Sequence, residues 1–234
     1  MSAAAPTVIR TKDFVADAAA LILERARKAI AERNEFRIAL SGGNTPAPVY
    51  ARIAAEARDF PWKRVRFTFG DERCVPPDEP QSNFRMAREN LFVPAGVPEK
   101  SIMRMRGEID PPTAAQEYEG RLNAIATNSG ESIYQHDLIL LGLGDDGHTA
   151  SLFPGTAALD EKMRRVVANF VPKLNAWRLT FTFRLINHAR HILFLVGASK
   201  SPRLIERVLA GDQQFPAARV NPSIGDVTWM IAES

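Results

Sequence analysis

The chain has 234 residues, of which 45% are hydrophobic and 24% are charged, and its formal net charge is +3. This composition fits one globular domain, or at most two small ones. Lysine and arginine are scattered without a block of like charge, which argues against binding to nucleic acid or to a membrane surface.

Cysteine content and apolar runs bear on the cellular compartment. The single cysteine, Cys74, cannot form an intrachain disulfide, which favours a reducing compartment. The apolar runs are far shorter than a membrane span. The first six residues lack the cationic region and apolar core of a secretory signal. We therefore expect a cytoplasmic protein without a membrane-embedded segment.

The first third of the chain predicts helices around a strand and a glycine-containing turn. Apolar residues at helical spacing predict an amphipathic helix over residues 13–33, and a short strand follows over 36–40. The strand runs into Ser41-Gly-Gly-Asn-Thr-Pro46, where Thr45 is expected to cap a helix that reaches about residue 57. Free N–H groups and the helix dipole at such a turn can bind an anion, although ordinary tight βα turns have the same pattern. The turn matches neither the Walker motif nor the dinucleotide-binding motif, and we expect no cofactor.

A second polar segment follows the next predicted strand. Residues 65–69 alternate with β-branched and aromatic side chains, so they predict a strand that Gly70 ends. Asp71-Glu-Arg73 comes directly after it. Such a pair of charges is usually a solvated surface pair, but at a glycine-containing strand end a ligand role is favoured. Ser82 or Asn83 is then expected to cap a helix that runs to about residue 92.

The middle of the chain leads to a glycine-rich bend with ionisable side chains. We expect a connection over residues 94–113, with a short strand at 102–105, and then a helix over 112–126. The unbroken apolar run at 138–141 is typical of a strand buried on both faces of a parallel sheet. The bend after it carries Asp145, Asp146 and His148 among three glycines. A histidine there can act as general base or acid, whereas in an isolated bend a structural histidine is favoured.

The last third of the chain repeats the arrangement of strand, polar end and helix. Strand patterns are found at residues 165–167, 179–183, 191–196 and 227–231. The third of them ends in Gly197-Ala-Ser-Lys200, and a helix is expected over 202–209. The alternation predicts an α/β fold with a mostly parallel sheet and helices on both faces. No domain boundary is evident, so we assign residues 1–234 to a single domain. Right-handed crossovers would bring the polar strand ends to one edge.

Three stretches resemble the signature of the 6-phosphogluconolactonases, which are relatives of the glucosamine-6-phosphate deaminases and isomerases. They are Ser41–Pro46, Asp71-Glu-Arg-Cys-Val-Pro76 followed by Ser82-Asn83, and Gly142-Leu-Gly-Asp-Asp-Gly-His-Thr-Ala-Ser-Leu-Phe-Pro-Gly155. The resemblance covers nearly the whole chain and implies a Rossmann-like fold. It also implies hydrolysis of 6-phospho-D-glucono-1,5-lactone to 6-phosphogluconate, the second step of the oxidative pentose phosphate pathway.

The resemblance further implies roles for individual residues. His148 would be the general base and would return the proton to the leaving oxygen. Asp146 would orient the His148 ring, and Arg73 would face the developing oxyanion. Asp71 lies where the deaminase relatives have an acid–base carboxylate. The residues expected at the substrate phosphate are Ser41, Gly42, Gly43, Asn44, Thr45, Lys200 and Arg203.

Three other functions share parts of these patterns. An amino-sugar-phosphate isomerase or deaminase would share the loop and the Asp-Gly-His core, but this chain has Asp-Glu-Arg73 where those enzymes have Asp-Glu-Tyr. A non-catalytic sugar-phosphate sensor would need no titratable His148. A metal hydrolase would have only Asp146 and His148 as ligands, so we expect no metal. The expected partner is a small phosphorylated sugar lactone. We expect a monomer, with a weak homo-oligomer left open.

Two local stretches depart from the family pattern. Ala232 stands where many relatives have an acidic residue, and residues 172–177 are unlike those of most relatives. Both are expected to lie away from the three motifs and to affect local packing more than function. The other histidines, His136, His188 and His191, flank predicted strands and are expected to be structural.

Overall fold

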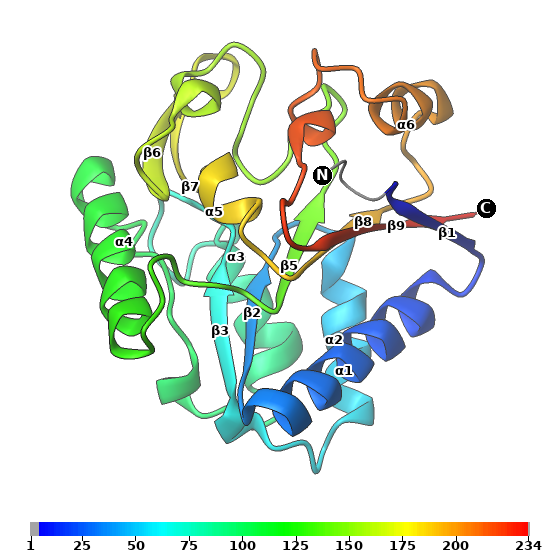
Figure 1. The fold of residues 1–234 in the computed structure, drawn as a ribbon, viewed down its shortest axis with the longest axis vertical. Helices are drawn as coiled ribbons and strands as arrows, with labels where there is room; N and C mark the ends of the chain where they lie inside the picture. The colour runs from blue at the N-terminus through cyan, green and yellow to red at the C-terminus, as the bar shows by residue number, and fades with distance from the viewer. Residues whose placement is uncertain (1–4, 234) are drawn as a thin grey trace.

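The computed structural model describes residues 5–233, so part of the segment in which we expected no secretory signal lies outside the described residues. Six strands form a parallel sheet in the order β1-β9-β8-β5-β2-β3 (Figure 1). They are β1 (Thr7–Thr11), β2 (Phe36–Leu40), β3 (Val65–Phe69), β5 (Leu138–Gly142), β8 (His191–Val196) and β9 (Asp226–Ala232). The predicted sheet is confirmed, and β1 is an additional edge strand.

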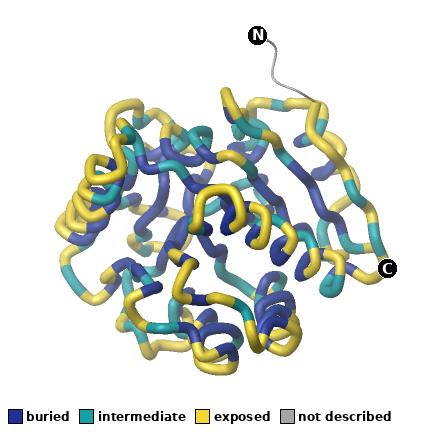
Figure 2. Tube along the Cα trace, turned by 60° about the horizontal axis from the view of Figure 1, so that its bottom comes forward, coloured by how far each residue is buried: buried dark blue, intermediate teal, exposed yellow. Residues whose placement is uncertain are grey.

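Helices cover both faces of this sheet, as predicted (Figure 1). One face packs against α1 (Phe14–Arg33), α2 (Pro46–Glu56) and α3 (Asn83–Ala87); the other packs against α4 (Pro111–Asn128), α5 (Phe183–Ile186) and α6 (Pro202–Leu209). Leu138 and Leu140 of β5 belong to the first core, and Ile139 and Leu141 to the second. Successive strand side chains point to opposite faces, so a strand between two cores is apolar throughout. Figure 2 shows buried strands in the middle of the molecule and exposed outer helix turns.

A second, antiparallel sheet was not predicted. Its strands are β4 (Asp71–Arg73), β7 (Ala176–Phe181) and β6 (Val166–Val171), in that order. The segment at 71–73, which we expected only as the polar end of the preceding strand, is a short strand of its own beyond Gly70. The strand expected over 179–183 instead begins at Ala176, and Phe183 already belongs to α5. The apolar side chains of this sheet pack with α4 in the second core.

Some local details differ from the prediction. Thr45 has helical dihedrals (φ −70°, ψ −46°) and its side chain makes no capping hydrogen bond within the described chain. Ser82 does cap α3, because its Oγ accepts from the Arg85 backbone N–H at 3.2 Å. The predicted strand at 102–105 is only a single bridge between Ile102 and Phe67.

Several short helical turns complete the fold. A π-helical turn over Arg88–Phe92 continues α3; 3₁₀ turns lie at Trp62–Arg64, Glu99–Ser101, Ala157–Asp160, Pro172–Leu174 and Pro216–Arg219. Within residues 5–233, we find no helix with the length and apolarity that crossing a membrane requires.

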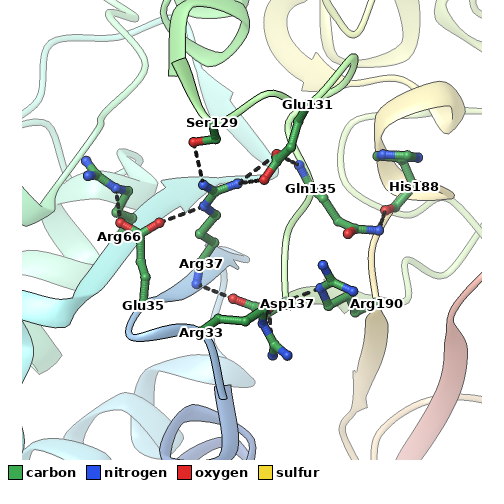
Figure 3. Close-up of polar contacts among 10 residues, drawn as sticks. All are labelled: Arg33, Glu35, Arg37, Arg66, Ser129, Glu131, Gln135, Asp137, His188 and Arg190. Carbon is green, nitrogen blue, oxygen red and sulfur yellow. Dashed lines mark hydrogen bonds and ion pairs between the residues drawn. The ribbon is translucent and has the colours of Figure 1, made fainter. Parts of the chain in front are cut away.

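Ion pairs hold the amino-terminal ends of the central strands (Figure 3). The Arg37 guanidinium in β2 lies 2.8 Å from Glu131, and its backbone N–H donates to Asp137 at 2.8 Å. Asp137, directly before β5, also accepts from Arg33 at 3.1 Å and lies 3.4 Å from the Arg190 Nε. The charges at this edge are thus paired with one another.

Candidate active site

A pocket opens at the carboxyl ends of β2 and β5, which are neighbours in the sheet. From β2 the chain continues to β3 on one side, and from β5 it continues to β8 and β9 on the other side. Ligands of open α/β sheets bind where the strand order reverses in this way. The pocket has a volume of about 510 Å³, which is within the range of small-molecule sites. Its lining includes the predicted residues Ser41, Gly42, Gly43, Asn44, Thr45, Asp71, Arg73, His148 and Lys200.

The turn after β2 is held in place by Tyr50 of α2. The buried Tyr50 hydroxyl donates to the Ser41 carbonyl at 2.8 Å and accepts from its N–H at 3.1 Å. Gly43 has a φ of +97°, which favours glycine. At Gly42 a Cβ atom would lie 1.7 Å from Asn83 Oδ1, so the turn is pressed against that side chain. The result is a fixed turn in front of the α2 N-terminus.

The loop that carries Lys200 lies beside this turn. A Cβ atom added to Gly197, at the end of β8, would be 3.2 Å from Thr45 Oγ1, so the two strand ends are in contact. The Lys200 ammonium lies 2.6 Å from Asp145, whose side chain is 90% exposed. Arg203 is an exposed residue of α6 and is not among the described residues that line the pocket. Its contact with phosphate stays a prediction.

His148 and Asp146 form a hydrogen-bonded pair in the bend after β5. His148 Nδ1 lies 2.5 Å from Asp146 Oδ1. Burial raises the pKa of Asp146, but hydrogen bonds from Lys173 and His148 outweigh it and hold this pKa at about 2. Because the carboxylate can only accept, Nδ1 carries the hydrogen that it donates, and in the neutral form of the imidazole the lone pair is then on Nε2. The ring is also stacked on Phe153, with centroids 3.9 Å apart. The arrangement provides an oriented base.

Gly144 leaves room for the His148 ring. A Cβ atom at this position would lie 2.0 Å from Nδ1 and 2.1 Å from Cε1 of His148. Gly144→Ala should therefore displace the imidazole and lower kcat about 100-fold, since misplacement by about 1 Å can cost this much. Steady-state turnover of the lactone that the sequence resemblance implies as substrate, with circular dichroism to verify folding, would measure the effect.

A matched glycine lies outside the pocket. Gly120 is an exposed position of α4, where an added Cβ atom would meet no described atom within 4 Å. Gly120→Ala should keep the rate unchanged. If Gly144→Ala retained the rate of this control, the imidazole position seen in the structure would not be the one that matters for activity.

The two carboxylates of β4 point in opposite directions. Asp71 faces the pocket, where it accepts from Ser151 Oγ at 2.7 Å and from Asn83 Nδ2 at 3.1 Å. Glu72 is buried and accepts from the backbone N–H groups of Asn83 at 2.7 Å and Phe84 at 2.8 Å. Burial raises the pKa of Glu72. Glu72 thus joins β4 to the start of α3, and only Asp71 is positioned to meet a ligand.

Two buried hydroxyls in the pocket wall have no partner among residues 5–233. They are Ser41 Oγ and Thr149 Oγ1, with the residues 7% and 1% exposed. Buried polar atoms are nearly always hydrogen-bonded, because leaving them unpaired is costly. Ala150, next to Thr149, also has a φ of 46°, which is uncommon for a residue other than glycine. Both features are typical of a site that binds a polar ligand.

The segment 172–177 was wrongly expected to lie away from the motifs. It forms the tip of the β6–β7 hairpin, and its Lys173 ammonium makes an ion pair with Asp146. The same ammonium lies 4.8 Å from the centre of the Phe153 ring. Lys173, Leu174 and Arg178 all line the pocket and were missed as site residues. A lysine in a turn has no local signal of function; only the fold brings it to Asp146.

The remaining candidate nucleophiles and ligands are absent from the site or inert. Burial raises the pKa of Cys74 to about 11, so this thiol is protonated and a poor nucleophile. His136 is buried, hydrogen-bonded to Thr68 at 2.9 Å, and burial lowers its pKa to about 3. Across residues 5–233, we find no group of three or more His, Cys, Asp or Glu side chains placed to hold a metal ion.

Comparison with known proteins gives consistent matches over nearly the whole chain. Residues 10–229 match the family model described as glucosamine-6-phosphate isomerases/6-phosphogluconolactonase. A 6-phosphogluconolactonase from Synechocystis sp. is 43% identical over 228 residues, which covers 96% of this chain and 93% of the relative. The crystal structure of 6-phosphogluconolactonase from Thermotoga maritima has a TM-score of 0.85 at 29% identity, covering 97% of this chain and 100% of that chain. A monomeric glucosamine-6-phosphate deaminase has a TM-score of 0.78 at 19% identity over 97% of each chain, so it shares the fold.

Proposed function

The chain belongs to the glucosamine-6-phosphate isomerase/6-phosphogluconolactonase family, and we propose that it hydrolyses 6-phospho-D-glucono-1,5-lactone to 6-phosphogluconate. The observation that carries this proposal is the His148–Asp146 pair, which offers a free Nε2 in a pocket that also contains an anion-binding turn. We place the reaction in the pentose phosphate pathway and the protein in the cytoplasm.

The reaction needs one group that accepts and then returns a proton. His148 Nε2 takes a proton from water, and the resulting hydroxide attacks the lactone carbonyl carbon C1. The electron pair of the carbonyl bond moves to its oxygen. When this tetrahedral intermediate collapses, the bond between C1 and the ring oxygen breaks, and the ring oxygen takes the proton from the imidazolium. The acid that forms loses its proton to solvent, so no covalent enzyme intermediate is required.

The surrounding charges support this assignment of roles. Asp146 stabilises the imidazolium, as the carboxylate of a catalytic triad does, and Lys173 holds Asp146 from the other side. Arg73 lines the pocket and would face the oxyanion, where preorganised charge contributes most to catalysis. Asp71 is held by Ser151 and Asn83, which supports a role in positioning the substrate.

The phosphate would bind at the opposite side of the pocket. The turn at 41–45 offers backbone N–H groups and the N-terminus of α2, and Lys200 offers a positive charge beside it. Phosphate would have to replace Asp145 as the partner of Lys200. Arg203 could join only by a movement of its side chain, and it is the least supported of the predicted phosphate ligands.

The nearest alternative is an amino-sugar-phosphate deaminase, because such an enzyme can have the same fold. One experiment separates the two functions: the purified protein is given 6-phosphogluconolactone and, separately, glucosamine 6-phosphate. We expect lactone opening far above its spontaneous rate and no ammonia release. Because the lactone opens slowly without enzyme, acid release must be compared with a matched protein-free reaction.

Two results would refute the proposal in different ways. Ammonia release at a rate rivalling lactone opening would assign the protein to the deaminases. Lactone opening no faster than the protein-free reaction, together with tight binding of 6-phosphogluconate, would instead indicate a sugar-phosphate sensor.

A further inference from the structure

Two arginines face each other across the second sheet at the pocket wall. Arg73 of β4 is paired directly with Arg178 of β7, and Asp71 with Thr180. Side chains of directly opposed residues point to the same face and lie about 5 Å apart at Cβ. Asp71, Arg73 and Arg178 all line the pocket, so this sheet face forms one wall of it.

Like charges in directly opposed positions destabilise a sheet. Both arginines are partly buried, and neither forms an ion pair with a carboxylate in the part of the chain that the structure describes. Their hydrogen bonds go only to backbone oxygens: Arg73 to Gln81 at 2.5 Å, and Arg178 to Trp177 at 3.1 Å. Asp71, the nearest candidate partner, is held by the neutral groups of Ser151 and Asn83.

Among the described residues, no carboxylate is thus ion-paired with either of these guanidinium groups, in contrast to the other two cations of the pocket. Lys173 and Lys200 are paired with Asp146 and Asp145. The pKa of Arg178 is lowered, mainly by burial and then by the charge of Arg73, and the nearby carboxylates of Asp71 and Glu72 offset this only in part. A protein that keeps two guanidinium groups together without a counter-ion has a preformed site for an anion.

We propose that Arg178 acts with Arg73 as a two-guanidinium site for the carboxylate end of the substrate. The pair would bind the oxyanion of the tetrahedral intermediate and then the carboxylate of the product. This inference rests on the proposed lactonase function and adds Arg178 as a further catalytic residue.

The position of β7 points to the carboxylate end rather than to the phosphate. The β6–β7 hairpin is attached to the segment that carries His148 at two places: Lys173 at its tip contacts Asp146, and Thr180 Oγ1 in β7 accepts from the Ser151 N–H at 3.2 Å. In the sequence, Arg178 lies between these two contacts, and it lines the same pocket as His148. The phosphate turn at 41–45 instead contacts the end of β8 through Gly197.

Binding measurements with two ligands test which end the pair recognises. 6-Phosphogluconate has a carboxylate and a phosphate, whereas glucose 6-phosphate has only the phosphate. Arg178→Met should weaken 6-phosphogluconate about 10–100-fold, the usual effect of removing a charged hydrogen-bonding partner, and keep glucose 6-phosphate within about 3-fold. The affinity of Arg178→Lys for 6-phosphogluconate should lie between those of the wild type and Arg178→Met. Lysine retains the positive charge but cannot form the two parallel hydrogen bonds of a guanidinium group. The matched control Arg184→Met removes an exposed arginine of α5 and should change neither affinity.

Thermal unfolding without ligand separates an anion site from a structural role. If the two guanidinium groups only repel each other in the free protein, Arg178→Met should unfold at the same temperature as the wild type or higher. A clear fall in Tm, or equal weakening of both ligands, would overturn the proposal. Unchanged affinity of Arg178→Met for 6-phosphogluconate would overturn the proposal as well.

A kinetic measurement on Arg178→Met depends on the proposed lactonase function, whereas the binding measurements do not. Arg178→Met should lower kcat for lactone hydrolysis about 10²–10³-fold, as expected for an oxyanion donor. The wild type could open no lactone while Arg178→Met still weakened the binding of 6-phosphogluconate selectively. That result would refute the lactonase function and keep the anion site. A variant with normal kcat in an active wild type would remove Arg178 from the mechanism.

Discussion

Replacing His148 with glutamine should lower the rate of lactone hydrolysis by about 10²–10⁴-fold, the usual contribution of a general base. Glutamine can still donate a hydrogen bond to Asp146, so the bend after β5 should keep its shape. It cannot take a proton from water. The measurement is kcat for 6-phosphogluconolactone after subtraction of spontaneous opening, with the binding of 6-phosphogluconate as evidence that the pocket remains intact.

A second histidine provides the control. His188 is partly buried near the start of β8, away from the residues that line the pocket, and Gln135 contacts only its backbone carbonyl. His188→Gln should keep the rate within a few-fold. Turnover near that of the wild type in His148→Gln would remove His148 from the mechanism and leave the proton transfer without an assigned base.

The parallel sheet could be predicted because its central strands have a simple signal. The runs at 138–141 and 192–196 are buried on both faces, and an uninterrupted apolar run is what two cores require. The edge strand β1 has no such run; most of its residues are exposed, and it is held by its pairing with β9. Its sequence therefore resembles that of a loop.

The antiparallel sheet could not be predicted because its pairing is remote in sequence. Asp71 pairs with Thr180, and β4 is only three residues long. A segment of this length has no period of its own, and its pairing depends on how β7 returns from the hairpin. The pairing of β4 with β7 matters for function, because this sheet turns Asp71 and Arg73 toward the pocket and Glu72 toward α3.

The candidate site was predictable where a motif is local and not where it depends on the hairpin. The turn at 41–45, the pair Asp71 and Arg73, and the bend with His148 each follow a strand of the parallel sheet or a glycine next to one. The topology of that sheet brings all three to one edge, although the antiparallel sheet sets the direction of Asp71 and Arg73. Lys173 and Arg178 come from the β6–β7 hairpin, whose position over the pocket is set by tertiary packing. The segment 172–177 differs from the family pattern, which led us to assign it to packing.

Loss of the phosphate group should make the lactone a far poorer substrate, and Lys200→Ala should narrow this difference. Binding energy at the phosphate can orient the reacting carbonyl, so its loss lowers kcat as well as affinity. Lys200 is one charged donor at this end. Its removal should lower kcat/KM for 6-phosphogluconolactone by about 10–100-fold and that for gluconolactone by only a few-fold. The measurement is kcat/KM for both lactones with both proteins.

Two further variants show whether the effect belongs to the phosphate end. Asp145→Asn removes the carboxylate that lies 2.6 Å from Lys200 and should lower KM for the phosphorylated lactone only, since phosphate no longer competes with it. Arg73→Met should slow both lactones, because Arg73 would act at the carbonyl that they share. Equal turnover of the two lactones by the wild type would discard the phosphate site while keeping the hydrolase. If Lys200→Ala instead slowed both lactones equally, Lys200 would act at the reacting carbonyl, and the phosphate would have to bind elsewhere in the pocket.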